Sequence, residues 1–432
     1  MKSEDASGKI GRREFMAATA GAAGFMIINS SLVRGAAANS AVRVGLLGCG
    51  GRGTADATDL IETGGARVVA LADLFQDQLD KAKVTFDKLN AERGYASIDR
   101  SQMFVGPTAF EQMANSKEVD AVVVTSPPYF HPQHLGAVVD AGKHAYCEKP
   151  VAVDVAGAKT VVEIGKRAEG RLSLDVGFQI RNATPFVELA KRIHGGALGK
   201  IACGEVYYYS SFIDRPAWPN ASPVERRLRN WVYDRVLSGD IIVEQNIHVI
   251  DVCNWFLQAH PVKAQAGGGR GVRTDPGDAY GHYNVVFYYP DDVHVTLNST
   301  QFDKGWWDVN ERIFGSKGVS ESHYSGPCAI YGDEPWAWKA PQSADTQADT
   351  SKFSAAGVFH DNLADADPNK KKAFIESITG GKFHNQAATG VESALSGMLG
   401  RTAAYKGHEV TWDELLASDE KWDSGIDLNS LG

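Results

Sequence analysis

A glycine-rich turn between a strand and a helix constrains the fold of this chain more than any other stretch. Residues 42–47 predict a mostly apolar strand, and Gly48-Cys49-Gly50-Gly51-Arg52-Gly53 follows it directly. This is G-x-G-x-x-G at the position that the dinucleotide fingerprint requires. The first glycine permits a tight turn, the second lets the backbone approach a pyrophosphate, and the third allows close packing of helix and strand. The N-terminus of the helix would then offer N–H groups to the phosphates.

A carboxylate follows at the expected distance from this turn. A second apolar strand, residues 66–72, ends in Asp73, about twenty residues past the turn, where a carboxylate would bind the ribose hydroxyls of a dinucleotide. Leu74 and Phe75 come next, and neither can hold a 2′-phosphate. The sequence therefore favours NAD over NADP, with NADP still possible because Arg52 could reach the same place.

The alternation of strands and helices continues to an ionisable pair. Residues 120–125 predict a β-branched strand, and the stiff loop Ser126-Pro127-Pro128-Tyr129-Phe130-His131 follows it. The next strand ends abruptly at Glu148-Lys149-Pro150, where open α/β sheets bind ligands. A surface ion pair at a strand end is the alternative interpretation. His131 and His134 have a spacing that could hold a metal, but no third ligand is evident, so no metal site is predicted.

The pattern of the second half is different. A helix over residues 156–168 and a strand over residues 172–178 lead to Gln179-Ile180-Arg181-Asn182. Beyond Lys200 come longer β-type runs joined by short turns, at residues 204–212, 265–268, 282–289 and 294–299. Such runs describe an open, largely antiparallel sheet.

One helical segment of this half carries three polar residues in register. Glu244, His248 and Asp251 fall at i, i+4 and i+7, so a single helical face is expected to carry all of them. A core histidine with satisfied hydrogen bonds is the ordinary alternative for a lone His on a helix.

Together, the glycine turn, Glu148-Lys149-Pro150 and the His248 helix resemble the Gfo/Idh/MocA family of nicotinamide-dependent sugar and polyol oxidoreductases. The resemblance covers residues from about 42 to about 320 and continues more weakly to the C-terminus. It implies an α/β fold: an N-terminal Rossmann dinucleotide-binding domain plus a C-terminal α/β domain with an open, predominantly antiparallel sheet. Glu244 stands where the family commonly has Asp, and Asn246 where Gly is frequent, so the substrate cannot be carried over.

The resemblance also implies roles for individual residues. The predicted catalytic residues are Lys149, His248 and Glu244, and which of Lys149 and His248 is the base stays open. The predicted cofactor contacts are Gly48, Gly50, Gly51, Arg52, Gly53, Asp73, Ser126, Pro127, His131, Glu148 and Lys149. The predicted substrate contacts are Gln179, Arg181, Arg229, Trp231 and His248.

The N-terminus predicts an export address. Arg12-Arg13 precedes an apolar run over residues 17–28, which is too short to span a bilayer, and Ala36-Ala37-Ala38 offers a cleavage site. The paired arginines resemble a twin-arginine (Tat) signal, with a Sec signal or an uncleaved anchor as alternatives. The predicted organisation is a Tat-like signal peptide over 1–38, a Rossmann domain over 39–151, and a substrate-binding domain with a C-terminal helical tail over 152–432.

The net charge and the predicted export limit the classes of function that this chain can have. The net charge of -9 argues against nucleic-acid binding, since there is no basic excess to neutralise phosphates. A periplasmic protein has no free nicotinamide pool, so we predict an exported NAD(P)-dependent oxidoreductase with a tightly bound cofactor that acts on a sugar, polyol or glycoside. The alternatives are an NAD-dependent glycoside hydrolase working by transient oxidation, and a non-catalytic dinucleotide- or sugar-binding protein. The expected partners are the carbohydrate, the Tat machinery and a second copy of the chain, bound through the open sheet.

Overall fold

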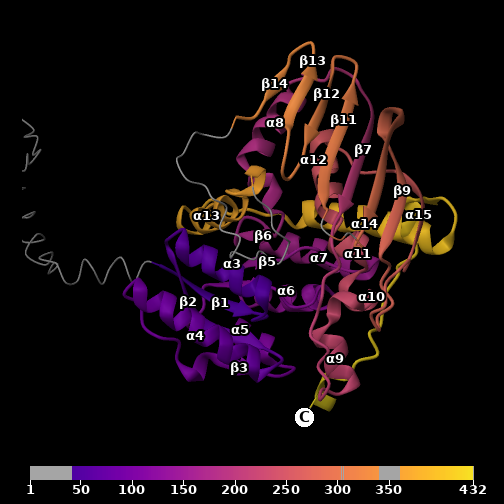
Figure 1. Cartoon of the computed structure of the whole chain (residues 1–432). Helices are drawn as coiled ribbons and strands as arrows, with labels where there is room; N and C mark the ends of the chain where they lie inside the picture. Colours follow the sequence, from indigo (N-terminus) through magenta and orange to yellow (C-terminus); the bar gives the residue numbers. More distant parts are fainter. Residues whose placement is uncertain (1–40, 303, 305, 340–360, 432) are drawn as a thin grey trace, which may run out of the picture. The chain divides into compact units, whose positions relative to one another are not determined.

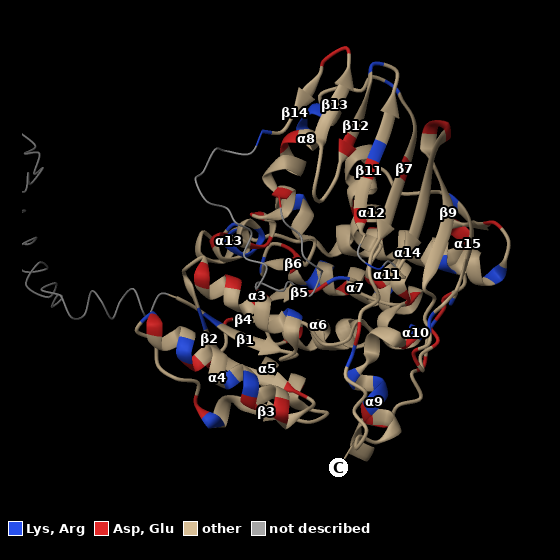
Figure 2. Cartoon of the chain, in the orientation of Figure 1, with Lys and Arg blue, Asp and Glu red and all other residues tan. Residues whose placement is uncertain are grey.

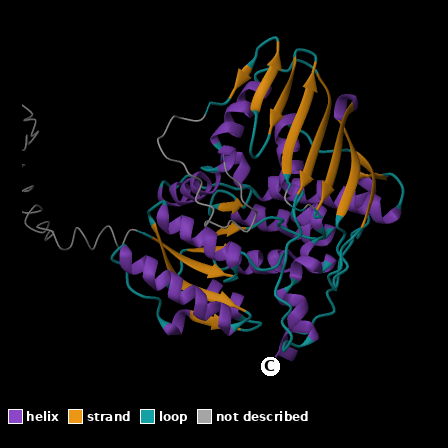
Figure 3. Ribbon diagram, in the orientation of Figure 1, coloured by secondary structure: helices purple, strands orange, loops and turns teal. Residues whose placement is uncertain are grey.

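The computed structural model describes residues 41–302, 304, 306–339 and 361–431. The predicted signal peptide, residues 1–38, lies outside these described residues. From Val42 onward the chain forms one unit, which is organised around two sheets (Figure 1, Figure 3). Within the described residues, every helix is too short or too polar to cross a bilayer.

The first sheet has six parallel strands in the order β3-β2-β1-β4-β5-β6. This is the strand order of a dinucleotide-binding Rossmann domain. The central strands are buried on both faces, because helices cover both sides of the sheet. The strands are β1 (Val42–Leu47), β2 (Ala66–Asp73), β3 (Met103–Val105), β4 (Ala121–Val124), β5 (His144–Cys147) and β6 (Leu174–Val176).

The helices of this sheet divide between two apolar cores. One core lies between the sheet and three helices, α3 (Gly51–Glu62), α4 (Gln76–Glu92) and α13 (Ala366–Thr379). The other face carries α5 (Ala109–Asn115), α6 (His131–Asp140) and α7 (Val155–Ala168). The position of α13 is unexpected, because it comes from the predicted C-terminal tail. Its Phe374 and Ile375 nevertheless belong to the Rossmann core.

The structure also moves the predicted domain boundary at residue 151. The strand predicted over residues 172–178 is β6, and it pairs in parallel with β5 as the sixth strand of the first sheet. The dinucleotide-binding half therefore extends to Val176. The segment β5-α7-β6 is one more strand-helix-strand unit, and its last strand is only three residues long.

The second sheet has nine strands in the order β14-β13-β12-β11-β7-β10-β9-β8-β15. All neighbouring pairs are antiparallel except β7 and β10, which are parallel. The predicted α/β fold with an open, predominantly antiparallel second sheet is thus confirmed. The strands are β7 (Ile201–Tyr209), β8 (Lys263–Gly269), β9 (His282–Tyr289), β10 (Val293–Thr300), β11 (Asp308–Gly315), β12 (Gly318–Ser322), β13 (Cys328–Gly332), β14 (Trp336–Ala337) and β15 (Val410–Thr411).

Helices cover one face of this sheet. Alternate side chains such as Tyr208, Phe287 and Leu297 are buried, and they share a core with the helices on that face. These helices are α8 (Thr184–His194), α12 (Ile247–Leu257) and α14 (Ala387–Lys406), and α15 (Trp412–Ala417) follows β15. The opposite face carries no helix among the described residues (Figure 3).

A long connection between β7 and β8 supplies most of the polar residues discussed below. It contains three short helices before α12 (Figure 1). They are α9 (Pro223–Arg229), α10 (Arg235–Ser238) and α11 (Ile241–Glu244).

Candidate active site

The glycine turn is closed on one side and open on the other. A Cβ atom at Gly48, whose φ is +98°, would lie 2.6 Å from the carbonyl carbon of Thr125, and one at Gly53 would lie 2.1 Å from the Gly48 oxygen. A Cβ at Gly50 or Gly51 would meet nothing within 4 Å. The turn is therefore tight against the protein but accessible where a pyrophosphate has to approach. These residues fit a bound dinucleotide.

Asp73 is held at the carboxyl end of β2 by the backbone. Its Oδ2 accepts a hydrogen bond from the Cys49 N–H at 2.7 Å, and its Oδ1 accepts one from the Phe75 N–H at 2.9 Å. Burial raises the pKa of this carboxyl, although both N–H groups oppose the shift. Each carboxylate oxygen has a second lone pair, so the group can still accept hydrogen bonds from ribose hydroxyls.

Arg52 is not free to reach a 2′-phosphate. Its Nε donates to Glu148 at 3.0 Å, and its two terminal nitrogens donate to Asp367 of α13 at 3.1 and 2.9 Å. It also lies 3.2 Å from Asp56, one turn along α3. The predicted cofactor contacts Arg52 and Glu148 are thus bound to each other, and Arg52 is also bound to a helix that sequence reasoning did not connect with the site.

We call this group the Arg52 cluster: Arg52, Asp56, Tyr146, Glu148, Asp367 and Lys371. The Lys371 ammonium lies 2.6 Å from Asp56 and 2.8 Å from Asp367, and it donates to the Tyr146 hydroxyl at 2.9 Å. Despite burial, Arg52 and Lys371 hold the pKa of Asp367 well below its usual range. Burial raises the pKa of Asp56 to about 7. Two cations face three carboxylates, so one extra proton would neutralise the cluster.

Lys149 and His248 lie next to this cluster. The Lys149 ammonium donates to the backbone oxygen of Glu244 at 2.8 Å and to its carboxylate at 3.1 Å; the two side chains are 12% and 14% exposed. His248 is 2% exposed, and neither ring nitrogen has a hydrogen-bond partner among the described residues. Burial, followed by the charges of Lys149 and Arg52, lowers the pKa of His248 well below its ordinary value. The imidazole is therefore neutral near pH 7.

The prediction of one helical face for Glu244, His248 and Asp251 is wrong. The helix is interrupted at Gln245 and Asn246, between α11 and α12, where the Asn246 N–H bonds to the Ile241 oxygen, one residue farther back than in an α-helix. As a result Glu244 contacts Lys149, whereas Asp251 pairs elsewhere.

The partner of Asp251 is Arg181, a predicted substrate contact. The guanidinium donates to the two carboxylate oxygens at 2.8 and 2.9 Å and lies over the Trp255 ring. Arg181 is therefore engaged within the protein. Gln179, from the same short segment, is buried, and its Oε1 has no hydrogen-bond partner in the described structure.

The loop after β4 is fastened by two histidines. His131 has Nδ1 at 2.7 Å from the Pro150 oxygen and Nε2 at 2.7 Å from the Ser126 oxygen. The Ser126 hydroxyl lies 2.8 Å from Nδ1 of His134. His131 thus joins the Ser126-Pro127 loop to the Lys149-Pro150 turn, rather than presenting a ring nitrogen to a cofactor or metal.

Two further predicted substrate contacts, Arg229 and Trp231, lie elsewhere. Arg229 bonds to Asp77, and Trp231 packs in an apolar cluster with Phe130. The residues that sequence reasoning missed are Asp56, Asp367 and Lys371. The i,i+4 spacing of Arg52 and Asp56 was a local signal for Asp56. No local signal identifies Asp367 or Lys371, because the Arg52–Asp367 contact spans 315 positions in the sequence.

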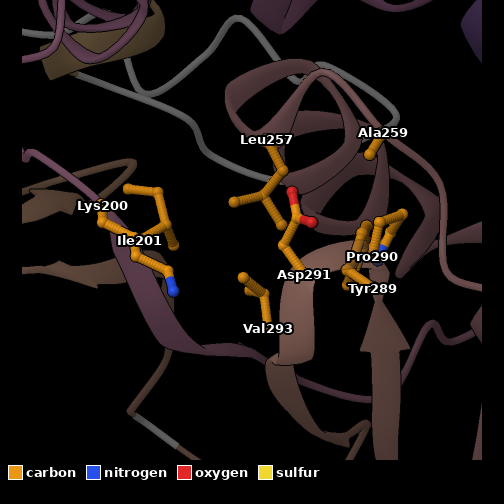
Figure 4. A pocket seen from close by; sticks show the side chains of 8 residues that line it. All are labelled: Lys200, Ile201, Leu257, Ala259, Tyr289, Pro290, Asp291 and Val293. Carbon is orange, nitrogen blue, oxygen red and sulfur yellow. The ribbon is translucent and has the colours of Figure 1, made fainter.

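A separate pocket of about 350 Å³ lies at the far end of α12 (Figure 4). Leu257 lines it, nine positions after His248, or about 13 Å along the helix. None of the residues predicted for the site contributes to it, so we do not assign it to the chemistry. Its lining residues are Lys200, Ile201, Leu257, Ala259, Tyr289, Pro290, Asp291 and Val293.

A Rossmann sheet with an accessible glycine turn lies beside a half-buried Lys–Glu pair and an imidazole that has no hydrogen-bond partner in the described part of the chain, and this arrangement is that of a nicotinamide-dependent oxidoreductase. Comparison with known families agrees. Residues 42–176 match the oxidoreductase family with an NAD-binding Rossmann fold, and residues 186–321 match the GFO/IDH/MocA C-terminal domain. The chain belongs to the GFO/IDH/MocA oxidoreductase family, and its cofactor is NAD(P).

The individual relatives share less than 30% sequence identity with this chain in the three comparisons that follow. The chain is 28% identical over 280 residues to myo-inositol 2-dehydrogenase of Thermotoga maritima, covering 64% of this chain and 74% of that protein. Among solved structures, it is similar to an aldose-aldose oxidoreductase from Caulobacter crescentus complexed with glycerol (TM-score 0.65, 20% identity, 86% and 99% covered). It is similar to the same degree to a levoglucosan dehydrogenase in complex with NADH and levoglucosan (TM-score 0.65, 17% identity, 86% and 99% covered). At these identities the two structures show the fold alone.

Proposed function

We propose that this protein oxidises a secondary alcohol of a small polyol or sugar, with NAD as the hydride acceptor. One observation carries the proposal: a Lys149 ammonium held by Glu244 lies near a buried, neutral imidazole that has no hydrogen-bond partner among the residues that the structure describes. Buried polar groups in folded proteins are normally bonded, and leaving one unsatisfied costs about 1–3 kcal/mol. Unpaired groups at the carboxyl end of a Rossmann sheet are best explained by a ligand that completes them.

The chemistry follows from the two side chains. A bound nicotinamide supplies the hydride acceptor. Two of the three N–H groups of Lys149 donate to Glu244, which leaves one for the substrate oxygen. The ammonium stabilises the negative charge that develops on that oxygen. Neutral His248 accepts the hydroxyl proton, so we assign it as the base and Lys149 as the charge-stabilising donor.

The substrate class rests on the relatives. They include inositol dehydrogenases and a 1,5-anhydro-D-fructose reductase, whose substrates are polyols or sugars. Glu244 and Asn246 replace residues that are frequent in the family, so we propose the class and not one compound.

NAD is favoured over NADP by the charges around the ribose position. Asp73 is joined there by Asp77, and the nearest cation, Arg229, already pairs with Asp77 at 2.7 Å. A 2′-phosphate would have to approach two carboxylates.

The test is a single-turnover reaction of the purified protein loaded with NAD. Mixing with myo-inositol, glycerol or levoglucosan should produce the near-ultraviolet absorbance of reduced nicotinamide for at least one compound. A nitrophenyl glycoside is run in parallel. Release of nitrophenol without net reduction would instead indicate a glycosidase, and neither signal would indicate a binding protein.

We further propose that the protein is exported with its cofactor tightly bound. The support is the pair Arg12-Arg13 before an apolar run, which lies outside the described residues. Substituting Arg12→Lys and Arg13→Lys together should keep the precursor in the cytoplasm, because lysine lacks the planar guanidinium. Mature protein in the periplasmic fraction of that variant would instead indicate Sec export.

We also propose that two copies of the protein associate through the open face of the second sheet. Large apolar side chains are exposed on this face or near it, such as Tyr331 (51%) and Trp306 (57%). Sedimentation analysis of the double variant Tyr331→Ser/Trp306→Ser should show a smaller species than the unmodified protein. An unchanged mass would rule out this face as the interface.

A further inference from the structure

The connection after β7 lies against the dinucleotide-binding edge of the first sheet. We call residues 216–231 the strap; it contains α9 and closes on itself, because Asn230 donates to the Pro216 oxygen at 3.4 Å. Ser222 caps α9 by accepting a hydrogen bond from the Glu225 N–H at 3.1 Å. The helix carries one acidic residue, Glu225, followed by three arginines, Arg226, Arg227 and Arg229 (Figure 2).

Arg229 fastens the strap to the first turn of α4. Its guanidinium donates to both carboxylate oxygens of Asp77, at 2.7 and 3.3 Å, and to Glu225 at 2.7 Å. Its two faces are covered as well: the guanidinium carbon lies 3.8 Å from the centre of the Phe75 ring and 4.4 Å from that of Trp218. With a side chain only 9% exposed, Arg229 makes a clasp between two distant parts of the sequence.

The clasp lies at the ribose position. Phe75 is two residues beyond Asp73, whose carboxylate is held for the ribose hydroxyls. Arg229 contacts Phe75 and Asp77, which are two and four residues beyond Asp73. A residue first considered for substrate binding is therefore placed at the adenosine end of the cofactor groove.

Apolar contacts extend the strap across the groove. Val224, Leu228 and Trp231 of the strap share one cluster with residues from two loops of the first sheet. These are Leu74 and Phe75 after β2, and Tyr129 and Phe130 after β4. Since β2 and β4 flank β1 in the sheet, the two loops lie on either side of the glycine turn that follows β1. The strap spans both loops, and therefore crosses the position of the dinucleotide.

We propose that the strap is the gate of the cofactor site, and that the Arg229 clasp keeps it shut and sets the rate at which NAD(H) leaves. The inference rests on the proposed function, since it assumes that a dinucleotide occupies the groove. It gives the retention of the cofactor a physical cause. A dinucleotide can leave only when the strap opens, and opening separates Arg229 from Asp77 and from Phe75.

The contacts that opening breaks are strong for a protein surface. Hydrogen bonds to charged groups are about twice as strong as neutral ones, and a desolvated guanidinium over an aromatic ring adds a further contribution. Removing them raises the population of the open strap without touching Lys149, His248 or the glycine turn. The chemical step should therefore be unaffected.

The experiment measures the release of NADH from the full-length mature protein. The NADH-loaded protein is mixed with excess NAD, and the decay of the bound NADH fluorescence gives the release rate. The test variant is Arg229→Met, which keeps an apolar stem over Phe75 but loses the charge. The matched control is Arg226→Met, on an exposed position of the same helix. We expect release to be at least tenfold faster for Arg229→Met and unchanged for Arg226→Met, with equal single-turnover oxidation rates.

A second variant guards against a folding defect. Asp77→Asn removes the partner of Arg229 from the other side of the clasp, at a side chain that is 39% exposed. It should also accelerate release, and the double variant should be no faster than Arg229→Met alone, because both changes break one contact. Wild-type release rates in Arg229→Met and Asp77→Asn would overturn the gate while leaving the oxidoreductase intact. A wild-type protein that binds no dinucleotide and oxidises no polyol would overturn the proposed function and the gate together.

Discussion

Two polar regions of this protein, the Arg52 cluster and the surroundings of His248, lie side by side and differ in whether their polar groups are paired within the protein. In the Arg52 cluster each charged side chain contacts one of opposite sign, so Arg52 and Lys371 are both surrounded by carboxylates. At His248, by contrast, both ring nitrogens lack a hydrogen-bond partner in the described structure. In the first region the charges are compensated within the protein, whereas the second contains a neutral imidazole whose ring nitrogens, without a partner among the described residues, are left for a ligand.

This difference in pairing indicates that the Arg52 cluster positions the site, whereas Lys149 and His248 carry out the chemistry. Paired charges fix Glu148 beside the glycine turn, and the Lys149 N–H donates to the Glu148 carboxylate at 3.1 Å, so the cluster orients the turn that carries Lys149. Unpaired groups cost stability, and proteins keep them mostly where function requires them. We therefore expect substitutions in the two regions to affect different properties.

The largest expected effect is on catalysis. Lys149→Ala and His248→Ala should each lower the single-turnover oxidation rate by about 10²–10⁴-fold, the usual contribution of a general acid or base. Both variants should retain bound NADH, because neither residue belongs to the glycine turn. Rates and fluorescence titration are measured on the same samples. Wild-type turnover in both variants would contradict the assignment of this site.

The next effect is on stability and belongs to the Arg52 cluster. Lys371→Met leaves the three carboxylates of the cluster facing one cation, Arg52, instead of two. It should lower the free energy of unfolding by about 3–5 kcal/mol, as measured by urea denaturation. Lys372→Met, at an exposed position of the same helix, is the control. Adding Asp56→Asn to Lys371→Met should recover part of the loss. If Lys371→Met is as stable as the control, the cluster does not hold the fold together.

The third prediction concerns how the oxidation rate and the stability depend on pH through His248. Because the pKa of His248 is lowered well below 6.5, the base stays neutral and the oxidation rate should not fall with an apparent pKa near 6.5. Below pH 6.5 the unfolded chain binds a proton at His248 that the folded protein does not, so the folded state loses stability as the pH falls. Above pH 6.5 His248 is neutral in both the folded and the unfolded chain, so it adds no pH dependence to the stability. The loss amounts to at most about 1.4 kcal/mol per pH unit and should be absent in His248→Ala.

The smallest effect concerns Gln179. Its Oε1, which has no partner among the described residues, should accept one hydrogen bond from the substrate. Gln179→Leu should therefore raise the KM by roughly tenfold or less, because one neutral hydrogen bond contributes about 1 kcal/mol. The free energy of unfolding should stay within about 1 kcal/mol, since no partner is lost. A KM equal to that of the unmodified protein would place Gln179 outside the substrate site.

The sequence was sufficient wherever a local pattern fixes the structure. The glycine turn, Asp73 at the end of its strand and the change from alternating βα units to antiparallel strands are all short-range features, and the predicted fold is confirmed. The strand over residues 172–178 was placed in the second domain, whereas β6 pairs with β5 in the first sheet, because periodicity does not tell which sheet a three-residue strand will join.

The site was less predictable, for two physical reasons. The interruption between α11 and α12 falls at Gln245-Asn246, with no Pro or Gly to signal it, and it turns Asp251 toward Arg181. The contacts of Arg52 with Asp367 and of Arg229 with Asp77 join residues 315 and 152 positions apart. Only the packing of the whole chain brings such pairs together.

The most direct test of the central claim is a crystal structure of the protein with NADH and a polyol that it oxidises. The account predicts a substrate hydroxyl within about 3 Å of both the Lys149 ammonium and a ring nitrogen of His248. A polyol bound in the pocket at the far end of α12, with His248 bonded to another protein group, would contradict it.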